Sequence, residues 1–322
     1  MITAGEEFRD DGRQLRGLAP ADVKRLSAID AGKATLAVVE TWAVIALAAA
    51  AAIAWWHPIV VVIAILVIGS RQHALFALAH DAAHYRLYRT RWLNDLVGGL
   101  CGAAGGISMR TYRVIHRLHH NHLYGREDPD VALAGGCPRG RAYLLRKLAT
   151  DLAGLTAHKT YAYFFGHPAL NDARGEAIKP LDDTSPRLRQ HARRDRVLVI
   201  ALQAGLFVAA IATGWWLEYL LLWIVPAVTV LQALLRLRAV LEHGAVRNFD
   251  SALTAARTNT ASAVLLWWLF PHHVNYHIEH HLYPAIPHYN LAEAHALLRR
   301  SGALADAEVS PVGQSLVRVL GT

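Results

Sequence analysis

The sequence predicts an all-α integral membrane protein, in which four transmembrane helices form two hairpins and a cytosolic helical cap carries a histidine-rich site for two metal ions. Hydrophobic residues make up 54% of the 322 residues, a larger share than soluble domains usually have. Four apolar segments reach the length of about 20 residues that a helix needs to cross a bilayer. The 19 histidines are numerous for this length, and several fall in tight clusters outside those segments.

The N-terminal segment, residues 1–32, is charged throughout and has no apolar run before a small-residue cleavage site. We therefore expect it to be cytosolic and uncleaved. A membrane domain is predicted over residues 33–298, followed by a cytosolic C-terminal tail over residues 299–322. Cys101 and Cys137 lie apart and without CxxC spacing, so neither a disulfide framework nor a thiolate zinc site is predicted.

The four transmembrane helices are predicted at residues 36–55, 59–79, 197–216 and 219–240. Only a few residues join each consecutive pair, which predicts two helical hairpins. Tryptophans stand at both links, and aromatic rings favour the membrane–water interface, so both links are expected on one side. Nearly all Arg and Lys lie in the other segments, so the positive-inside rule predicts that both termini and the long middle segment are cytosolic. Arg71, Arg236 and Arg238 are expected to snorkel to water from the cytosolic helix ends.

Shorter apolar stretches over residues 93–109 and 261–270 predict interfacial or re-entrant helices. Residues 142–165 mix apolar and charged positions, which predicts a helix lying against the membrane face. Residues 166–195 are polar and contain three prolines, which predicts an irregular cytosolic loop. The glycines over residues 98–106 lack the GxGxxG spacing of a dinucleotide site and predict close helix packing.

Three histidine clusters lie on the predicted cytosolic side, and His243 ends the fourth apolar segment. The clusters read HDAAH over residues 80–84, HRLHH over residues 116–120 and HIEHH over residues 277–281. A spacing of four residues brings two imidazoles onto one helix face. In a triplet such as HRLHH, the second histidine lies about 60° to one side of the first and the third about 40° to the other. One helix can therefore address two metal ions.

The number of histidines predicts more than one ion. Nine candidates exceed the four ligands of a structural zinc site, so two metal ions are predicted. Imidazole suits iron, copper, zinc and nickel, so ligand type alone does not choose among them.

In order and placement, the three clusters resemble the three histidine boxes of the membrane fatty acid desaturase and hydroxylase family. The run from Asn275 to Leu291 is similar to the third box and downstream signature of acyl-lipid desaturases, and Asp128-Pro129-Asp130 also recurs in that group. The resemblance covers residues 36–298. It implies that two irons are held by His80, His84, His116, His119, His120, His277, His280 and His281, with His243 as a further ligand. Some members place an Asn four residues before that last histidine to hold a metal-bound water, whereas this chain has Ala239.

Ligating imidazoles usually donate their second N–H to a carboxylate or carbonyl. We expect eight further residues to support the ligands, either by accepting this N–H or by lying next to a ligand. They are Asp81, His122, Asp128, Asp130, Glu242, His273, Asn275 and Glu279. For Asp128 and Asp130, a turn around Pro129 is an equal alternative. The role of His272 is left open. The histidines predicted to be structural are His57, His73, His158, His167 and His191.

The resemblance implies an O2-dependent di-iron oxidoreductase that introduces a double bond into an acyl chain or a similar apolar substrate. The chain has neither a flavin or nicotinamide fold nor the HPGG motif of a fused cytochrome b5. A separate electron donor is therefore expected, of the ferredoxin, rubredoxin or cytochrome b5 type, and Arg-rich loops would suit an acidic donor. A hydroxylase or oxygenase on the same scaffold, acting on a lipid, carotenoid or small natural product, is the alternative.

Two other classes of protein are disfavoured. A metal transporter or sensor would need ionisable ligands within the spans, and the middles of the four segments are expected to lack histidine and carboxylate. The net charge of +8 is compatible with nucleic acid binding, but the apolar segments favour an anionic lipid surface instead. A composition rich in Ala and Arg and poor in Lys favours the inner membrane of a bacterium.

Overall fold

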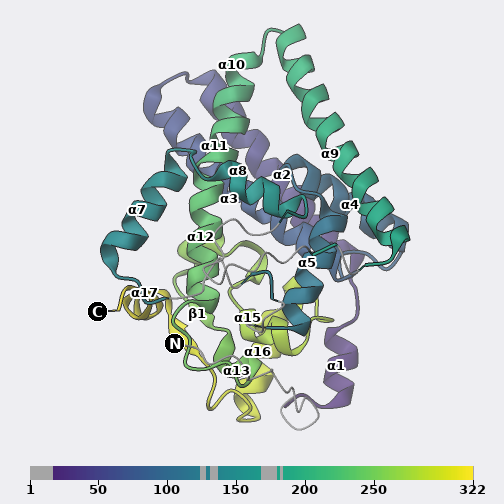
Figure 1. The fold of residues 1–322 in the computed structure, drawn as a ribbon, viewed down its shortest axis with the longest axis vertical. Coiled ribbons are helices and arrows are strands. Elements are labelled where there is room, and N and C mark those ends of the chain that lie inside the picture. Colours follow the sequence, from purple (N-terminus) through teal and green to yellow (C-terminus); the bar gives the residue numbers. More distant parts are fainter. Residues whose placement is uncertain (1–16, 124–127, 131–136, 168–179, 182–183, 322) are drawn as a thin grey trace.

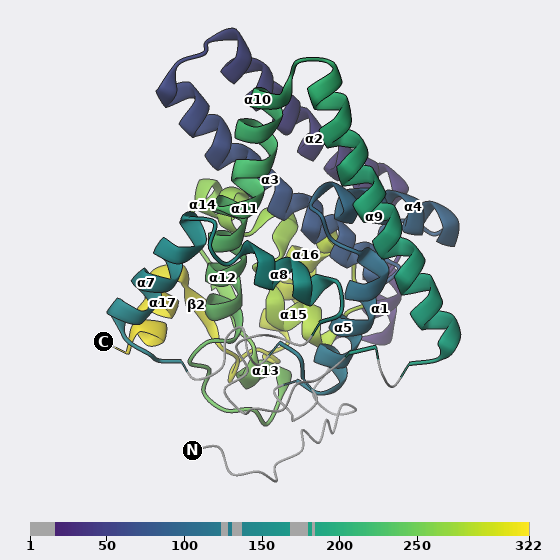
Figure 2. The same ribbon diagram turned by 45° about the horizontal axis from the view of Figure 1, so that its top comes forward.

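The structure is a computed structural model that describes residues 17–123, 128–130, 137–167, 180–181 and 184–321. It is mostly helical. Its longest helices extend toward one end, and short helices and loops gather at the other (Figures 1 and 2). The first described element is α1 (Pro20–Leu26), so about half of the predicted N-terminal segment lies outside the described residues.

Four helical runs are long and apolar enough to cross a membrane, as the sequence predicts. They are α2 (Ala31–Ala54), α3 (Pro58–Ala83), α9 (Pro186–Ala212) and the run Trp216–His243. α2 and α3 are joined by three residues and pack against each other. α3 also contacts the fourth run, so it is the central helix of the group.

The helix α9 begins well before the predicted segment. Pro186 occupies its first turn, where a missing N–H costs nothing, and the Ser185 hydroxyl accepts from the Leu188 N–H. The predicted irregular loop over residues 166–195 is therefore wrong from Pro186 onward. Residues 168–179 and 182–183 of that loop lie outside the described residues.

The fourth run is interrupted. It consists of α10 (Trp216–Tyr219), a π-helical turn η1 (Leu220–Ile224), α11 (Val225–Val228) and α12 (Val230–His243). Pro226 lacks an N–H, which frees backbone carbonyls in an apolar setting. Two amide side chains donate to carbonyls of this stretch: Gln72 to Trp223 at 2.9 Å and Gln232 to Ala227 at 2.7 Å. Two amide side chains therefore supply hydrogen-bond donors to the backbone on either side of Pro226.

Two arginines predicted to snorkel are instead buried. Arg71 is 1% exposed, lies 3.5 Å from a Glu40 carboxylate oxygen, and stacks 3.7 Å from the centre of the Trp267 ring. Arg238 is 7% exposed and donates to Glu242 at 2.8 Å. Because α3 runs from Pro58 to Ala83, His73 lies near its middle, which corrects the expectation that the spans lack histidine there.

Short helices cover the end of α3 that carries the first histidine cluster. α4 (Arg91–Ala104) and α5 (Met109–Asn121) pack against both α3 and α9. Along α4, Trp92, Leu96 and Leu100 are each at least half exposed. Their spacing of four residues places them on one stripe, a pattern that suits contact with lipid.

Two other stretches, residues 142–165 and 261–270, were predicted to be helices at the membrane surface. Residues 142–165 form two helices rather than one, α7 (Arg141–Leu152) and α8 (Ala157–Phe164). The chain turns between them at Gly154, whose φ of +76° suits glycine. The stretch 261–270 contains α14 (Ala263–Leu269).

The glycines after the first cluster permit close packing, as predicted. A Cβ atom added to Gly98 would lie 2.1 Å from the Cβ of Ala82, next to the first cluster. One added to Gly102 would lie 3.0 Å from the Ile107 carbonyl oxygen. α4 can therefore lie directly against the end of α3.

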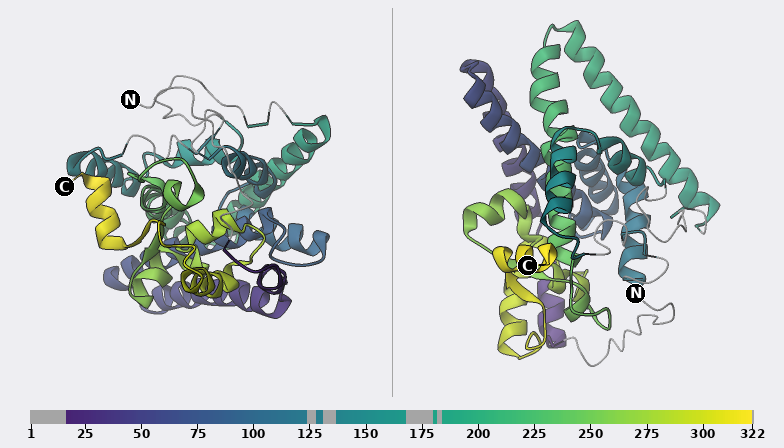
Figure 3. Two further views of the ribbon diagram at one scale, coloured as in Figure 1. Left: turned by 90° about the horizontal axis from the view of Figure 1, so that it is seen from below. Right: turned by 60° about the vertical axis from the view of Figure 1, so that its left-hand side comes forward.

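A small sheet departs from the all-α prediction. β1 (Thr258–Thr260), which follows α13 (Ala252–Ala255), pairs in parallel with β2 (Val309–Pro311). The next helix, α17 (Val312–Leu320), packs against α12, and Figure 3 shows this yellow helix beside the green one. Residues 309–320 of the predicted tail are thus part of the folded domain. Strands of three residues are too short to leave a pattern in the sequence.

Candidate metal centre

The nine predicted histidines come together in two groups. The five-histidine group contains His80, His84, His116, His120 and His280, and the four-histidine group contains His119, His243, His277 and His281. Within each group, one nitrogen of every histidine lies within 4.8 Å of the others. The side chains come from α3, α5, α12 and α15 (His277–Leu282). Residues of all three clusters, far apart in the sequence, therefore share one interior space.

Each triplet divides between the groups in the way that helical geometry predicts. On α5, His116 and His120 point to the five-histidine group, whereas His119 points to the other. On α15, His280 belongs to the first group, and His277 and His281 belong to the second. One helix contributes to both groups because the histidines three and four positions after the first one point to opposite sides of it.

The end of α3 is held in place by side chains from its neighbours. The Arg113 guanidinium donates to the carbonyls of Ala82 (2.9 Å) and Ala83 (3.1 Å), which end the helix. The Asn94 amide also donates to the Ala82 carbonyl, at 2.9 Å. Positive side chains suit the negative end of a helix dipole. These contacts fix the point at which His84 leaves the helix.

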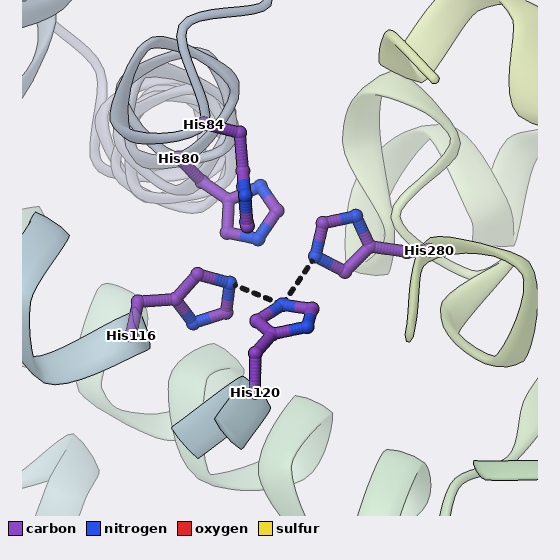
Figure 4. Close-up of side chains that lie close together, drawn as sticks. All are labelled: His80, His84, His116, His120 and His280. Carbon is purple, nitrogen blue, oxygen red and sulfur yellow. Dashed lines mark hydrogen bonds between the residues drawn. The ribbon is translucent and has the colours of Figure 1, made fainter. Parts of the chain in front are cut away.

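In the five-histidine group the Nε2 atoms converge (Figure 4). The Nε2 atom of His120 lies 2.9 Å from that of His116 and 2.9 Å from that of His280. Two nitrogens bound to one ion at about 2.1 Å, at right angles to each other, lie about 3 Å apart. The Nε2 atoms of His80 and His84 are buried and have no hydrogen-bond partner among the described residues. The donor set therefore fits a metal ion.

The four-histidine group is built in the same way. The Nε2 atom of His277 lies 2.6 Å from that of His243 and 3.1 Å from that of His281. The ring centre of His119 is 5.0 Å from that of His243 and 5.1 Å from that of His281. This group also offers a convergent set of nitrogen donors.

Burial keeps most of these imidazoles neutral, the form that binds metal. It lowers the pKa of His116, His120, His277, His280 and His281 well below the ordinary value, and that of His84 to about 3. Neighbouring histidines lower these pKa values further, because two imidazolium ions so close together would repel each other.

His119 is the exception. Burial alone would lower its pKa, but Asp128 and Asp130 outweigh burial and raise the pKa to about 9. Its Nδ1 atom lies 3.0 Å from Asp128 and 3.6 Å from Asp130. The Tyr163 hydroxyl donates to Asp130 in turn. The two predicted carboxylates therefore hold His119, and its Nε2 atom is left for the group.

Two further predicted partners also lie beside cluster histidines. A carboxylate oxygen of Glu242 is 3.6 Å from Nδ1 of His277, and one of Asp81 is 3.8 Å from Nδ1 of His80. His243 uses a partner that sequence reasoning did not find, the Ala255 carbonyl, at 3.1 Å from its Nδ1 atom. A backbone carbonyl leaves no signal in the residue types.

The remaining predicted partners lie elsewhere in the described structure. Glu279 accepts from Thr258 at 2.6 Å and pairs with Nδ1 of His295 at 2.6 Å. Asn275 donates to the Asn259 carbonyl at 3.0 Å. His122, at the end of α5, and His273, in the 3-10 turn η2 (Pro271–His273), belong to neither histidine group.

Two histidines outside the clusters were missed. His288 opens the 3-10 turn η3 (His288–Asn290) and pairs with Asp81, and His295 lies on α16 (Leu291–Arg300) and pairs with Glu279. Each binds a carboxylate that belongs to a histidine cluster. The only signal in the sequence is their position shortly after the third cluster, which does not reveal a partner.

Comparisons with known proteins point in one direction. The family model described as fatty acid desaturase matches residues 54–312. A dihydrorhizobitoxine desaturase of Bradyrhizobium elkanii is 27% identical over 303 residues, which cover 89% of this chain and 78% of that protein.

Acyl-lipid enzymes are also similar. An sn-1 acyl-lipid omega-3 desaturase (ferredoxin) of Nostoc sp. (strain 36) is 26% identical, and the match covers 70% of this chain and 64% of that protein. A chloroplastic omega-3 fatty acid desaturase of Glycine max is 27% identical, over 70% of this chain and 51% of that protein. The chain thus spans between half and two thirds of the length of these two relatives.

Proposed function

The chain belongs to the fatty acid desaturase family, a family of oxidoreductases, and from this premise we propose that it is an O2-dependent di-iron enzyme that introduces a double bond into an apolar part of its substrate. The observation that carries the proposal is the division of nine histidines into two convergent groups. We propose these nine residues as the ligands of two irons.

Iron bound in the two groups would supply the oxidising power, drawn from O2 and two external electrons, that hydrogen removal from an unactivated C–H bond requires. The protein's own residues would fix this centre. Asp128 and Asp130 orient His119, the Ala255 carbonyl orients His243, and Glu242 lies beside His277. The buried side chains around the histidines would keep other reductants away from the two irons.

For the membrane arrangement, we propose two hairpins whose short links face outward, with both termini and the metal centre in the cytosol of a bacterial inner membrane. The distribution of Arg and Lys supports this orientation. The helical cap of α4, α5 and α15 would then lie on the cytosolic side. The proposed membrane domain begins at residue 33 after the segment 1–32, and the C-terminal segment 299–322 folds against it through β2 and α17.

For the substrate, an acyl chain or a similar apolar molecule is proposed, since the Nostoc relative is named as an acyl-lipid desaturase and the Glycine max relative as a fatty acid desaturase. The name of the Nostoc relative includes ferredoxin, which supports a donor of that type ahead of rubredoxin or cytochrome b5. The alternative is a hydroxylase on the same scaffold, and the reaction product separates the two.

The test uses the full chain in detergent, loaded anaerobically with ferrous iron and supplied with reduced ferredoxin, O2 and a palmitoyl or oleoyl lipid. Mass spectrometry of the products is the readout. A product that has lost two hydrogens supports desaturation, and one that has gained an oxygen supports the hydroxylase. Absence of bound iron in folded protein would overturn both. The variant His280→Ala removes one of the proposed ligands. Its control is His158→Ala, at an exposed position on α8.

A further inference from the structure

α5 carries histidines of the metal centre on one side and arginines that reach solvent on another. His116, His119 and His120 point to the two histidine groups. At 100° per residue, Arg110 and Arg117 leave the helix about 100–120° round from His116 and within about 20° of each other. Arg117 is exposed, and the side chain of Arg110 is 38% exposed. A positively charged stripe therefore runs along the outside of the helix.

The first turns of α9 pack against α5. The Arg110 N–H donates to the Asp195 carboxylate at 3.1 Å, and Val114 shares a small apolar cluster with Ala192. As the chain advances along α5, its contacts step back along α9, so the two helices run antiparallel. Figure 2 shows the start of α9 beside α5. The end of α5 and the start of α9 thus lie at the same end of the pair.

One side of this helix pair is covered, and arginines gather on the other. Arg196 on α9 donates to the Phe165 carbonyl at 2.6 Å, and a Cβ atom added to Gly166 would lie 3.3 Å from Thr111 on α5. The segment after α8 therefore covers this side of both helices. Four arginines that reach solvent leave their helices roughly 100–180° away from Arg196 or Thr111. This set, the α5–α9 basic face, consists of Arg110, Arg117, Arg187 and Arg194.

The α5–α9 basic face lies next to residues of the histidine groups. Arg117 directly follows His116, so their Cα atoms are about 3.8 Å apart. Arg117 and His120 are also neighbours on the helix surface, and His120 is partly exposed. α15 serves both groups as well, but its Ile278 and Glu279 are 0% exposed. A molecule docked on the face would be separated from both groups by little more than the width of α5.

A second basic helix, α7, lies in a different setting. Its exposed Arg141 and Arg146 stand beside Leu145 and Leu152, which are 65% and 52% exposed. Leucines exposed among cations suit a lipid surface, and α7 carries no member of the histidine groups. Arg187 instead precedes the apolar segment predicted from residue 197 by ten residues, about 15 Å of helix. The α5–α9 basic face therefore extends away from the membrane surface, where a soluble partner can reach it.

Resting on the desaturase function proposed above, we propose that the α5–α9 basic face is the docking surface of the electron donor, a small acidic one-electron carrier of the ferredoxin type. Arg117, Arg187 and Arg194 have no carboxylate partner among the described residues, so their charge is available to steer an acidic partner. Each docked carrier gives one electron to the centre and leaves oxidised. Two carriers, two protons and one O2 are used for each double bond, and the two hydrogens taken from the substrate leave in two waters.

The test measures oxidation of a reduced, acidic plant-type ferredoxin by the full chain in neutral detergent, after its bound iron has been oxidised. Absorbance without O2 gives the rate. Each rate is divided by the rate with reduced methyl viologen, a small cation that arginines do not attract. The variants are Arg117→Glu on α5 and Arg187→Glu on α9, and the matched control is Arg146→Glu on α7. Product is measured on the same samples after O2 and lipid are added.

We expect both variants of the face to lower this ratio at least tenfold at low salt and less at high salt, because salt screens the charges. Arg146→Glu should leave the ratio unchanged. If Arg117→Glu loses iron, Arg187→Glu decides, since α9 carries no histidine of either group. An unchanged ratio in Arg187→Glu, or an equal loss in Arg146→Glu, would overturn the proposal.

Two further outcomes separate this proposal from its rivals. A loss that appears only when phosphatidylglycerol is present would assign the face to lipid and overturn the docking surface. Oxidation of ferredoxin that depends on the face but yields no product would support the docking surface and overturn the desaturase function instead.

Discussion

Asp81 and His288 are 207 residues apart in the sequence, yet Nδ1 of His288 lies 2.7 Å from Oδ2 of Asp81. The backbone N–H of His288 donates to the same oxygen at 3.0 Å, and both side chains are buried. Because Asp81 directly follows His80, this carboxylate ties the first histidine cluster to the segment that follows the third. The pair holds elements on opposite sides of the centre in a fixed relation.

Replacing Asp81 by alanine should therefore weaken iron binding by about 10-fold to 100-fold, the usual effect of removing a residue that orients a ligand. The imidazole of His288 would also be left buried without its carboxylate, which destabilises the fold. Iron titration against a competing chelator measures the first effect. Glu293→Ala is the control, since that carboxylate is exposed and pairs with Arg25 at the surface. Iron affinity equal to that of the control would contradict the role given to Asp81.

The two histidine groups should lose iron separately. His280→Ala removes a member of the five-histidine group, and His119→Ala removes one of the four-histidine group. We expect the iron content to fall below two per chain in each variant, because the altered group loses one nitrogen donor while the other group keeps all of its own. Mass spectrometry of the metal content is the measurement, with His158→Ala as the control. Full iron content in both variants would rule out these groups as the metal site.

Iron binding at the four-histidine group should depend on pH through His119. The metal-free protein holds a proton on this ring up to its raised pKa of about 9, and iron must displace it. Affinity should therefore rise between pH 7 and pH 9 by up to about tenfold per pH unit, with release of about one proton. Calorimetry in buffers of different ionisation enthalpy measures the protons released.

A matched variant tests the cause of this pH dependence. Asp128→Asn removes the carboxylate nearest to His119, at 3.0 Å, so the pKa of His119 should fall and less proton should be released. If the unaltered protein and Asp128→Asn release the same number of protons at pH 7.5, the carboxylate does not control His119.

Sequence patterns predicted the spans and the nine histidines because both are local. A run of apolar residues or a spacing of four is visible in the chain itself. The carboxylate partners were predicted where they lie close in sequence to some histidine of the centre, as Asp128 does to His119 and as Glu242 does to His243, although Glu242 lies beside His277. His288 and His295 were missed because their carboxylates come from segments brought near only by folding, and Glu279 was assigned to the centre although it faces His295.

The C-terminal residues illustrate the same limit. They were predicted as a separate tail, but Arg257, which is 0% exposed, donates to Glu308 at 3.2 Å and to the Leu241 and Gly244 carbonyls at 3.1 and 3.0 Å. Arg257→Ala should destabilise the protein by about 3–5 kcal/mol, the usual cost of breaking a buried ion pair. It should also reduce the iron content of the four-histidine group, because Arg257 holds the carbonyls of Leu241 and Gly244, and His243 lies between these two residues in the sequence. Thermal unfolding and metal content test both effects, and wild-type values for both would contradict this role.

Two adjacent glycines of α4 offer the most closely matched comparison. A Cβ atom on Gly98 would lie 2.1 Å from the Cβ of Ala82, whereas one on Gly99 would meet no atom within 4 Å. Gly98→Ala must push α4 away from the end of α3, and overpacking of this kind costs about 1–3 kcal/mol. Gly99→Ala should instead stabilise the helix by up to about 1 kcal/mol, because alanine loses less backbone entropy.

The same pair tests whether the packing of α4 matters to the metal centre. Ala82 stands between Asp81 and His84, so a displaced α4 should weaken iron binding in Gly98→Ala and leave it unchanged in Gly99→Ala. Thermal unfolding in detergent and iron titration measure the two effects. Equal unfolding temperatures for the two variants would mean that α4 can move without cost. A destabilised Gly98→Ala with full iron affinity would instead show that the first histidine cluster keeps its geometry without α4.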